Sequence, residues 1–382
     1  MALRIQQKDL GIGRWTIVRH ARALHLRPAP YAHHRDLPWR VTPGALARGA
    51  RPDPYRVWLS GVMLQQTTVE AVKAYFRTFV EKWPTVEALA AAPAEDVMKA
   101  WAGLGYYSRA RNLKACADLM ARQGSGFPDN EAGLKELPGI GAYTAAAIAA
   151  IAFDRPAAVV DGNVERVISR LHSIEAPLSV AKPEIRALVG KLVPSTRPGD
   201  FAQAMMDLGA TICTPRRPRC MLCPVREDCS AILTGDPERF PMRLPKDDKP
   251  LRRGAAFVAE RNDGAILLRK RPDKGLLGAM TEVPTTAWTA RIDGATTEDA
   301  APFPADWRRA GQIGHVFTHF ALELDVFHAH IQGDAPVGHF WSLAHEISGE
   351  ALPTVMKKVI EAAIPGATKK ATPAAPVLKG PQ

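Results

Sequence analysis

The most concentrated chemistry in this sequence is a group of cysteines just past its middle. Four of the five cysteines in the 382 residues are separated by six, two and five residues: Cys213, Cys220, Cys223 and Cys229. Four thiolates so close together in the chain suit a metal centre. Structural zinc is the alternative here, because zinc also binds four cysteines. Five cysteines are too few for a disulfide scaffold. Cys116 is separate from the other four in the sequence, and its expected role is that of a small, buried hydrophobic residue.

Two further segments carry groups that suit contacts with phosphate. The sequence LPGIG places Gly139 and Gly141 where a tight turn exposes backbone N–H groups, and a helix after it adds its positive end. Arg216, Arg217 and Arg219 lie in the loop between the first two cysteines. We predict that both segments hold a DNA backbone without reading its sequence. The alternatives are an ordinary joint between helices and a solvated basic loop.

Composition and charge favour a nucleic-acid partner. Lys and Arg number 50 against 39 Asp and Glu, which gives a net charge of +11 and a pI near 9.5. Such an excess raises the local concentration of polyanions, although a merely basic enzyme has the same balance. With 46% hydrophobic and 23% charged residues, the chain is neither collagen-like nor wholly disordered.

No segment of the sequence predicts membrane insertion or secretion. The longest apolar run, over 145–153, is far too short to span a bilayer, and the start of the chain has no apolar stretch of a secretory signal. Residues 1–30 are predicted to be a disordered basic leader, with an organellar targeting peptide as the alternative. Residues 366–382 are predicted to be a disordered tail. We expect a cytoplasmic, nucleoid-associated protein.

The elements that position these groups are helical in the first part of the chain. One apolar stripe at helical spacing covers 58–80. Another covers 164–171 and follows Asp161 and Asn163, which are placed for its first turn. We therefore predict a mainly α-helical part over 31–233.

The hydrophobic period changes in the second part of the chain. The segment 234–251 is rich in proline and charge and is interpreted as an interdomain linker. Two alternating segments then flank the turn sequence at 262–264, which is a strong hairpin signal, and 321–327 alternates like a strand. We predict an α+β domain over 252–365.

The order of these motifs resembles the helix-hairpin-helix DNA glycosylases that carry a four-iron four-sulfur cluster. LPGIG comes first, Val160-Asp161-Gly162-Asn163 second and the four cysteines last. Four segments resemble the MutY-type adenine DNA glycosylases in that superfamily: LPWR at 37–40, MLQQT at 63–67, GLGYY at 103–107 and AMMDLG at 204–209. The resemblance covers about 31–365. It implies that the four cysteines hold the iron–sulfur cluster, and that the partner is double-stranded DNA.

The resemblance implies removal of adenine mispaired with 8-oxoguanine or guanine. A purine must leave the duplex to be reached, and inserted side chains then fill the gap. The residues implied for contacting the flipped base or wedging the stack are Trp39, Arg40, Gln65, Gln66, Thr67, Tyr106 and Asp207. Trp39 and Arg40 offer an apolar face and donors, and Asp207 would accept from the amino group of adenine. For Trp39 and Tyr106 the alternative is an ordinary place in the core, and for Asp207 it is a charge on a helix surface.

Breaking the glycosidic bond needs an anion near the sugar and an acid near the base. Asp161 is the implied anion, and N–H groups at the start of its helix are expected to keep it ionised. Asn163 and Tyr143 would position it, whereas a plain helix cap is the alternative for Asp161. Tyr143 stands where the bifunctional relatives carry a Schiff-base lysine. We therefore expect a monofunctional glycosylase rather than a pyrimidine-lesion glycosylase that cleaves the strand.

One position departs from the family pattern. The family carries its general-acid glutamate two residues before the methionine of MLQQT, and this chain has Gly61 there. Glycine has no proton to give, and Glu70, the nearest downstream carboxylate, is expected on the opposite face of the same helix. We therefore expect recognition of the mispair with slow excision. A lesion-binding protein without turnover is the alternative function.

The second domain resembles a Nudix fold from residue 256 onward. Only Glu282 remains of the glutamate cluster that magnesium-dependent hydrolysis needs, so the resemblance implies a lesion-reading domain instead. Three residues of its loop are implied to contact the oxidised base or wedge beside it: Phe317, Thr318 and His319. A turn with a buried histidine and phenylalanine is the alternative. We expect a monomer.

Overall fold

The computed structural model describes residues 34–244, 248–272 and 275–368. The predicted leader, and the predicted tail from 369 on, therefore lie outside the described residues.

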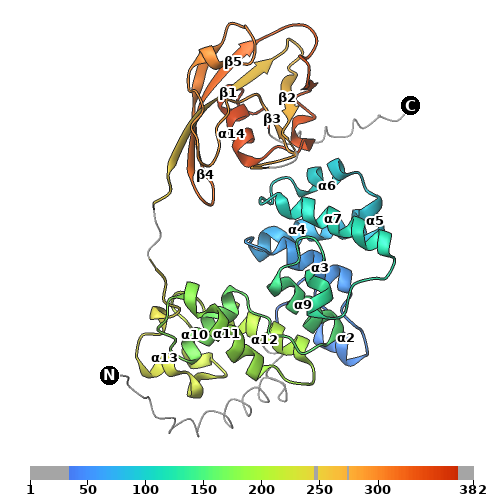
Figure 1. Cartoon of the computed structure of the whole chain (residues 1–382), viewed down its shortest axis with the longest axis vertical. Helices are drawn as coiled ribbons and strands as arrows, with labels where there is room; N and C mark the ends of the chain where they lie inside the picture. The colour runs from blue at the N-terminus through green and yellow to red at the C-terminus, as the bar shows by residue number, and fades with distance from the viewer. Residues whose placement is uncertain (1–33, 245–247, 273–274, 369–382) are drawn as a thin grey trace, which may run out of the picture. The chain divides into compact units, whose positions relative to one another are not determined.

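The chain divides into two compact units, coloured in Figure 1 by residue number. One unit contains residues up to 91 and 112–246, and the other contains 92–111 and the residues from 247 on. The division differs from the predicted one because the segment 92–111 groups with the C-terminal unit. Within that unit, Lys270 Nζ donates to Glu95 Oε1 at 3.1 Å, which is one contact that holds the segment there.

The first unit consists of helices joined by short turns. Its helices are α2 (Pro43–Ala47), α3 (Pro54–Met63), α4 (Val69–Lys82), α5 (Val86–Ala91), α7 (Ser108–Gln123), α8 (Glu131–Lys135), α9 (Ala142–Phe153), α10 (Gly162–Leu171), α11 (Leu178–Leu192), α12 (Pro198–Thr211), α13 (Ser230–Leu233) and the short η2 (Cys220–Leu222), η3 (Arg226–Asp228) and η4 (Pro237–Arg239). Side chains that accept from the first N–H groups begin several of them, such as Asp53 before α3 and Thr68 before α4. In the described part of the chain, no helix is long and apolar enough to cross a bilayer.

The apolar stripe over 58–80 belongs to two helices rather than to one. α3 ends at Met63 and α4 begins at Val69, and Gln66 in the turn between them has a φ of 55°. Both helices bury their apolar faces, so the stripe stays continuous in sequence while the backbone changes direction. The turn frees residues 65–67 from helical geometry.

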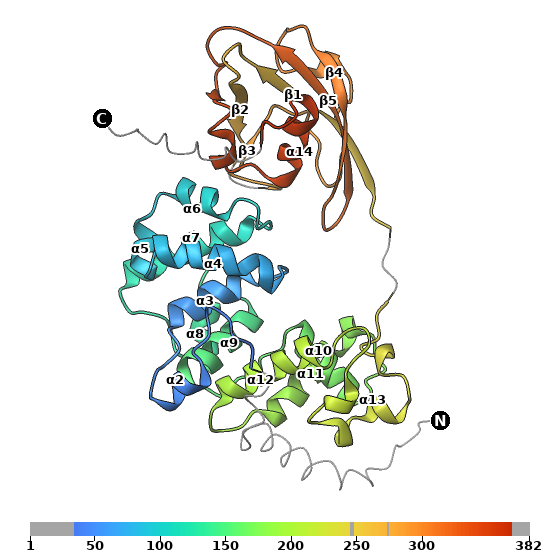
Figure 2. The same cartoon turned by 180° about the vertical axis from the view of Figure 1, so that it is seen from behind.

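The helix α9 is central to the first unit. Its sequence is apolar on all sides, and residues 144–150 are all buried. Helices α3, α8 and α12 pack against it, and its many alanines allow them to approach closely (Figure 2). A second apolar cluster joins α10, α11 and α12 and includes parts of three of the four clustered cysteines. The first turns of α9 and α10 are thereby fixed by packing.

Part of the segment 234–251, interpreted as a linker, packs against the first unit. Phe240 is buried, and its carbonyl accepts from Nε of Arg170 at 3.0 Å. The carbonyl of Met242 accepts from the N–H of Leu178 at 2.8 Å. Since the first strand begins at Leu251, only the later part of the segment connects the units.

The second unit contains a six-stranded mixed sheet with α14 (Thr354–Ala363) against one face (Figure 1). The strand order is β3-β2-β1-β5-β4, and β6 pairs with β2. Its other elements are β1 (Leu251–Glu260), β2 (Ile266–Lys270), β3 (Thr281–Glu282), β4 (Arg308–Val316), β5 (Ala321–His330), β6 (His339–Ser342), α6 (Ala94–Trp101), η5 (Glu298–Ala300) and η6 (Ile347–Gly349). The predicted hairpin joins β1 to β2, and the predicted strand at 321–327 is part of β5.

Alternate residues of β1 and β5 face two separate cores. Val258 and Val326 pack with α14 on one face. Phe257 and Phe327 pack with Trp307 on the other face. The paired central strands are therefore apolar on both faces, which explains why β1 does not alternate with polar residues.

Candidate active site

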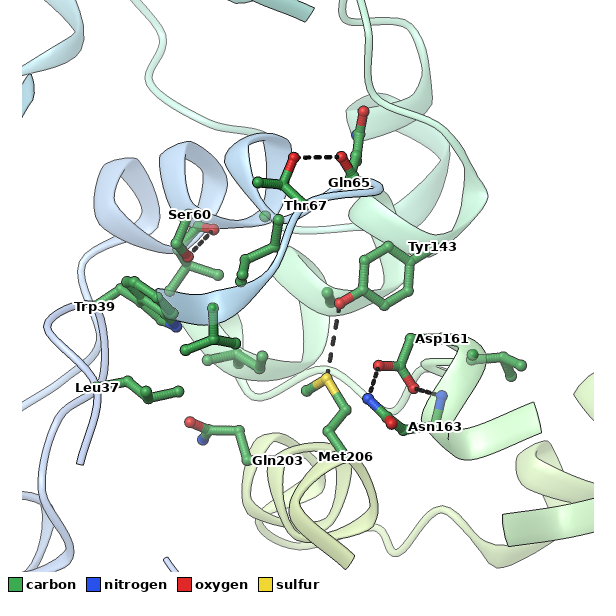
Figure 3. A pocket seen from close by; sticks show the side chains of 18 of the residues that line it. Leu37, Trp39, Ser60, Gln65, Thr67, Tyr143, Asp161, Asn163, Gln203 and Met206 are labelled. Carbon is green, nitrogen blue, oxygen red and sulfur yellow. Dashed lines mark hydrogen bonds between the residues drawn. The ribbon is translucent and has the colours of Figure 1, made fainter. Parts of the chain in front are cut away.

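A cavity of about 600 Å³ opens in the first unit where nine of the predicted catalytic and base-contacting residues meet (Figure 3). The segment before α2, the end of α3 with the turn after it, α9, the start of α10 and α12 all contribute to its walls. The predicted residues among those that line it are Trp39, Arg40, Gly61, Gln65, Gln66, Thr67, Tyr143, Asp161 and Asn163. This volume is typical of sites that bind small molecules, and it is large enough for a purine base.

Asp161 caps the N-terminus of α10 and is held by three hydrogen bonds. Its Oδ1 accepts from the backbone N–H groups of Asn163 at 2.9 Å and Val164 at 2.8 Å. Its Oδ2 accepts from Nδ2 of Asn163 at 2.9 Å (Figure 3). Burial nevertheless raises the pKa of Asp161 above its usual value, and the hydrogen bonds oppose this shift only in part. The N–H groups thus favour the ionised form, as expected, while loss of water opposes them, and the ionised state of Asp161 stays a prediction.

Asn163 links Asp161 to the cysteine loop through a buried arginine that the sequence analysis missed. Its amide oxygen accepts from Nη2 of Arg166 at 2.8 Å. Arg166 also donates to the carbonyl of Cys213 at 2.7 Å and to that of Gly209 at 2.6 Å. Arg166 is 7% exposed although it lies on the face of α10 opposite the apolar stripe. No local sequence signal marks it as buried.

Tyr143 faces the cavity from α9. Its hydroxyl donates to Sδ of Met206 at 3.7 Å (Figure 3). Burial raises the pKa of Tyr143, and the charge of Asp161 adds to the shift, so the phenol stays neutral beside that carboxylate. It offers a donor rather than a nucleophilic amine.

Asp207 positions Arg40 instead of facing the cavity. The guanidinium of Arg40 donates to both carboxylate oxygens, at 2.6 and 3.0 Å, and Asp207 is 4% exposed. The expectation that Asp207 accepts from a base is corrected, since both its oxygens are already bound and it is not among the described lining residues. Trp39 packs edge-on against Phe76, with ring centroids 5.4 Å apart. The Trp39–Arg40 segment is therefore anchored before any base arrives.

Gly61 lies near the end of α3 and lines the cavity. The nearest atom to a Cβ built at this position is Cγ2 of Thr144 at 3.6 Å, which is ordinary van der Waals contact. A Cβ at position 61 therefore fits without moving the backbone.

Two glutamates in this part of the first unit, Glu70 and Glu165, are paired with lysines. Glu70 lies on α4 rather than on the helix of Gly61, so the predicted reason for excluding it is wrong; its side chain is 81% exposed and pairs with a lysine. Among the described lining residues, the carboxylates are Asp161 and Glu165. The carboxylate of Glu165 is bound to Lys182 at 2.8 Å.

The predicted phosphate-binding segments lie apart from the cavity lining. Gly139 has a φ of 75°, and a Cβ there would lie 2.6 Å from Cβ of Asn112, so the turn requires glycine. Gly141 is the N-cap residue of α9. The three loop arginines, Arg216, Arg217 and Arg219, are exposed. Their contacts with DNA stay a prediction.

Comparisons with known proteins agree with this geometry. Residues 59–194 match the HhH-GPD superfamily of base excision DNA repair proteins, 255–362 match the NUDIX domain, and 213–229 match the iron–sulfur binding domain of endonuclease III. An adenine DNA glycosylase of Schizosaccharomyces pombe is 32% identical over 332 residues, 72% of each chain. One of Homo sapiens is 36% identical over 392 residues, which cover 85% of this chain and 70% of that protein. The chain belongs to the adenine DNA glycosylase family.

The glycosylase is therefore a DNA-binding base excision repair protein, and its fold is a helix-hairpin-helix part followed by a Nudix-like domain. Both predictions are confirmed. Its class is that of the monofunctional hydrolases of N-glycosyl bonds, which agrees with the neutral phenol of Tyr143 in the cavity.

The glycosylase carries a four-iron four-sulfur cluster, as predicted, and its cysteines fit that group. Cys213 Sγ accepts from Nη1 of Arg170 at 3.4 Å, and burial raises the pKa of the Cys223 thiol to about 11. A thiolate so buried needs a cationic partner, which cluster iron supplies when bound.

Purified protein is expected to contain about four iron atoms per chain and to show the broad visible absorption of an iron–sulfur cluster. The Cys223→Ser variant should lose most of both, because a hydroxyl is a poor iron ligand. Iron analysis and visible spectroscopy check this, with Cys116→Ser as the control because Cys116 lies outside the cysteine loop. Equal iron content in the two variants would contradict the assignment.

In the second unit, the predicted lesion-reading residues lie in the turn between β4 and β5. Phe317 stacks on Phe320, with ring centroids 4.7 Å apart, and packs against the core, while Thr318 and His319 are exposed. Phe317 is therefore half-buried rather than a free wedge. Tyr106 groups with this unit, is 45% exposed and accepts from the Thr318 hydroxyl at 3.4 Å.

Proposed function

We propose that this glycosylase binds duplex DNA containing adenine opposite 8-oxoguanine and everts the adenine into the cavity of the first unit. The observation that carries the proposal is that Asp161, Tyr143 and the turn at 65–67 line one cavity together. The turn supplies side chains that can fill the gap in the stack. Trp39 and Arg40 supply an apolar face and donors for the base edge.

Asp161 stabilises the positive charge that develops on the sugar as the glycosidic bond breaks. Its carboxylate is fixed by Asn163 and lies in a site of low dielectric, where an anion acts strongly on a nearby cation. Tyr143 gives a neutral donor beside it. Water supplies the nucleophile of the hydrolysis, and no amine is available at position 143 to form a Schiff base.

Donating a proton to the departing adenine is the step that this chain performs poorly. Gly61 has none to give, and the carboxylate of Glu165 is engaged by Lys182. We therefore propose tight recognition with slow excision. A lesion-binding protein is the second candidate function, favoured by Gly61 alone.

Binding tests the recognition part without any turnover. The holoprotein should bind a duplex with adenine opposite 8-oxoguanine at least tenfold more tightly than a duplex with cytosine opposite 8-oxoguanine, because the cavity accepts a purine. Gel-shift titration of both duplexes at one fixed salt concentration measures this. Equal affinities would contradict the proposal. We also propose that the protein binds as a monomer, which the stoichiometry of the same titration reports.

We propose that Thr318 and His319 read the oxidised base. Each hydrogen bond contributes about 1 kcal/mol, so replacing both residues by alanine should reduce the preference for 8-oxoguanine over guanine opposite adenine roughly tenfold or more. The His345→Ala variant is the control, because His345 is an exposed residue of the same unit outside this turn. An unchanged preference in the double variant would remove these residues from lesion reading.

A further inference from the structure

One cluster of ligating side chains lies outside the cavity and the cysteine loop. Glu260 ends β1, and His328 and His330 lie at the end of β5. The carboxylate oxygen Oε2 of Glu260 is 3.0 Å from Nε2 of His328 and 3.9 Å from Nε2 of His330. Ligand atoms from all three residues lie within 4.8 Å of one another.

The sheet register explains why these side chains meet. β1 and β5 are parallel neighbours, with Val258 opposite His328 and Glu260 opposite His330. Paired residues in a sheet point to the same face, and so do residues two apart in one strand. The three side chains therefore continue the row of Val258 beyond the end of the apolar core that packs on α14. The polar cluster is built by the backbone rather than by chance contact of flexible surface chains.

The donor set and spacing suit a divalent transition metal. A tetrahedral zinc ion bonded at about 2.1 Å places its ligands about 3.4 Å apart, which lies between the two observed distances. Two imidazoles and one carboxylate match zinc, whereas magnesium prefers oxygen ligands alone. We propose that Glu260, His328 and His330 bind one zinc-class divalent ion, with solvent in the fourth position.

Burial and charge around the cluster are compatible with a cation. The side chains of Glu260 and His328 are 20% and 22% exposed, while that of His330 is 64% exposed and leaves a path for the ion. Two arginines are neighbours of the cluster in the sheet, one next in sequence and one on the adjacent strand, and each is paired with a carboxylate. Arg261 binds Asp263 at 2.6 Å, and Arg308, which is opposite His328 on β4, binds Asp306 at 2.7 Å.

Zinc content of the full-length holoprotein tests the site. After dialysis against micromolar free zinc at about pH 7.5, where imidazole is mostly neutral, wild type should hold about one zinc ion more per chain than the His328→Ala/His330→Ala variant. Iron is measured in the same samples. Zinc displacing the cluster at the cysteines would lower iron equally in both proteins, so the difference between them reports the proposed site.

A milder variant keeps the test independent of folding. His330→Ala removes an exposed ligand and leaves the Glu260–His328 contact, so we expect a folded protein with at least tenfold weaker zinc binding. His345→Ala should bind like wild type, and magnesium should not replace zinc. Equal zinc in wild type and His330→Ala, or none in wild type, would overturn the proposal and leave a simple Glu260–His328 hydrogen bond.

Discussion

Replacing Gly61 by glutamate is expected to raise the single-turnover rate of adenine excision by about 10²- to 10⁴-fold, the usual value of a positioned general acid. The cavity already holds the other parts of the site, since Asp161, Tyr143 and the turn at 65–67 line it together. A Cβ at position 61 meets only ordinary contact with Thr144, and Gly61 lines the cavity, so we expect the acid to be added without remodelling α3. The measurement uses excess enzyme and a duplex with adenine opposite 8-oxoguanine.

Gly61→Gln is the matched control for this gain. Replacing a helical glycine by either residue raises helix stability by a similar amount, of order 0.5 kcal/mol, so both variants should be slightly more stable than the parent chain. Glutamine has nearly the shape of glutamate but no acidic proton. A fast parent chain, or equal acceleration by Gln and Glu, would show that this site does not depend on an acid at position 61.

The sequence predicts the elements and the chemistry of this protein better than it predicts the environment of its side chains. The hairpin at 262–264, the strand at 321–327 and the cap at Asp161 all follow from local rules, because turn and cap residues act within a few positions. The break between α3 and α4 was missed, since apolar spacing continues through the turn that contains Gln66.

Residues whose partners come from distant parts of the chain could not be predicted. Asp207 was expected to face a base, yet it is bound to Arg40, which is 167 positions away. Arg166 was overlooked because its partners, Asn163 and the carbonyl of Cys213, meet only when α10 packs on α12. Such pairs depend on tertiary packing, which no local periodicity encodes.

Replacing Asp161 by asparagine in the Gly61→Glu background is expected to lower excision by at least about 10²- to 10³-fold, since it removes the charge that stabilises the sugar cation. The fold should persist. Asparagine is as good a helix cap as aspartate, and its oxygen can accept from the N–H groups of Asn163 and Val164. Thermal unfolding should show a midpoint close to that of the parent, because removing a charge that burial disfavours offsets the hydrogen bond from Nδ2 of Asn163 that the new amide cannot accept.

The pH dependence separates this catalytic role from a structural one. Since the pKa of Asp161 is raised in the folded state, its proton is lost only above the usual range of aspartate. Excision by Gly61→Glu should fall as the pH drops through that raised value, and this acidic limb should vanish in Gly61→Glu/Asp161→Asn. The control is Asp129→Asn in the same background, which changes an exposed carboxylate paired with Arg155. This variant should keep both the excision rate and its decline at low pH. A persistent acidic limb in the Asp161→Asn protein would assign the titration to another group and remove the carboxylate at position 161 from the transition state.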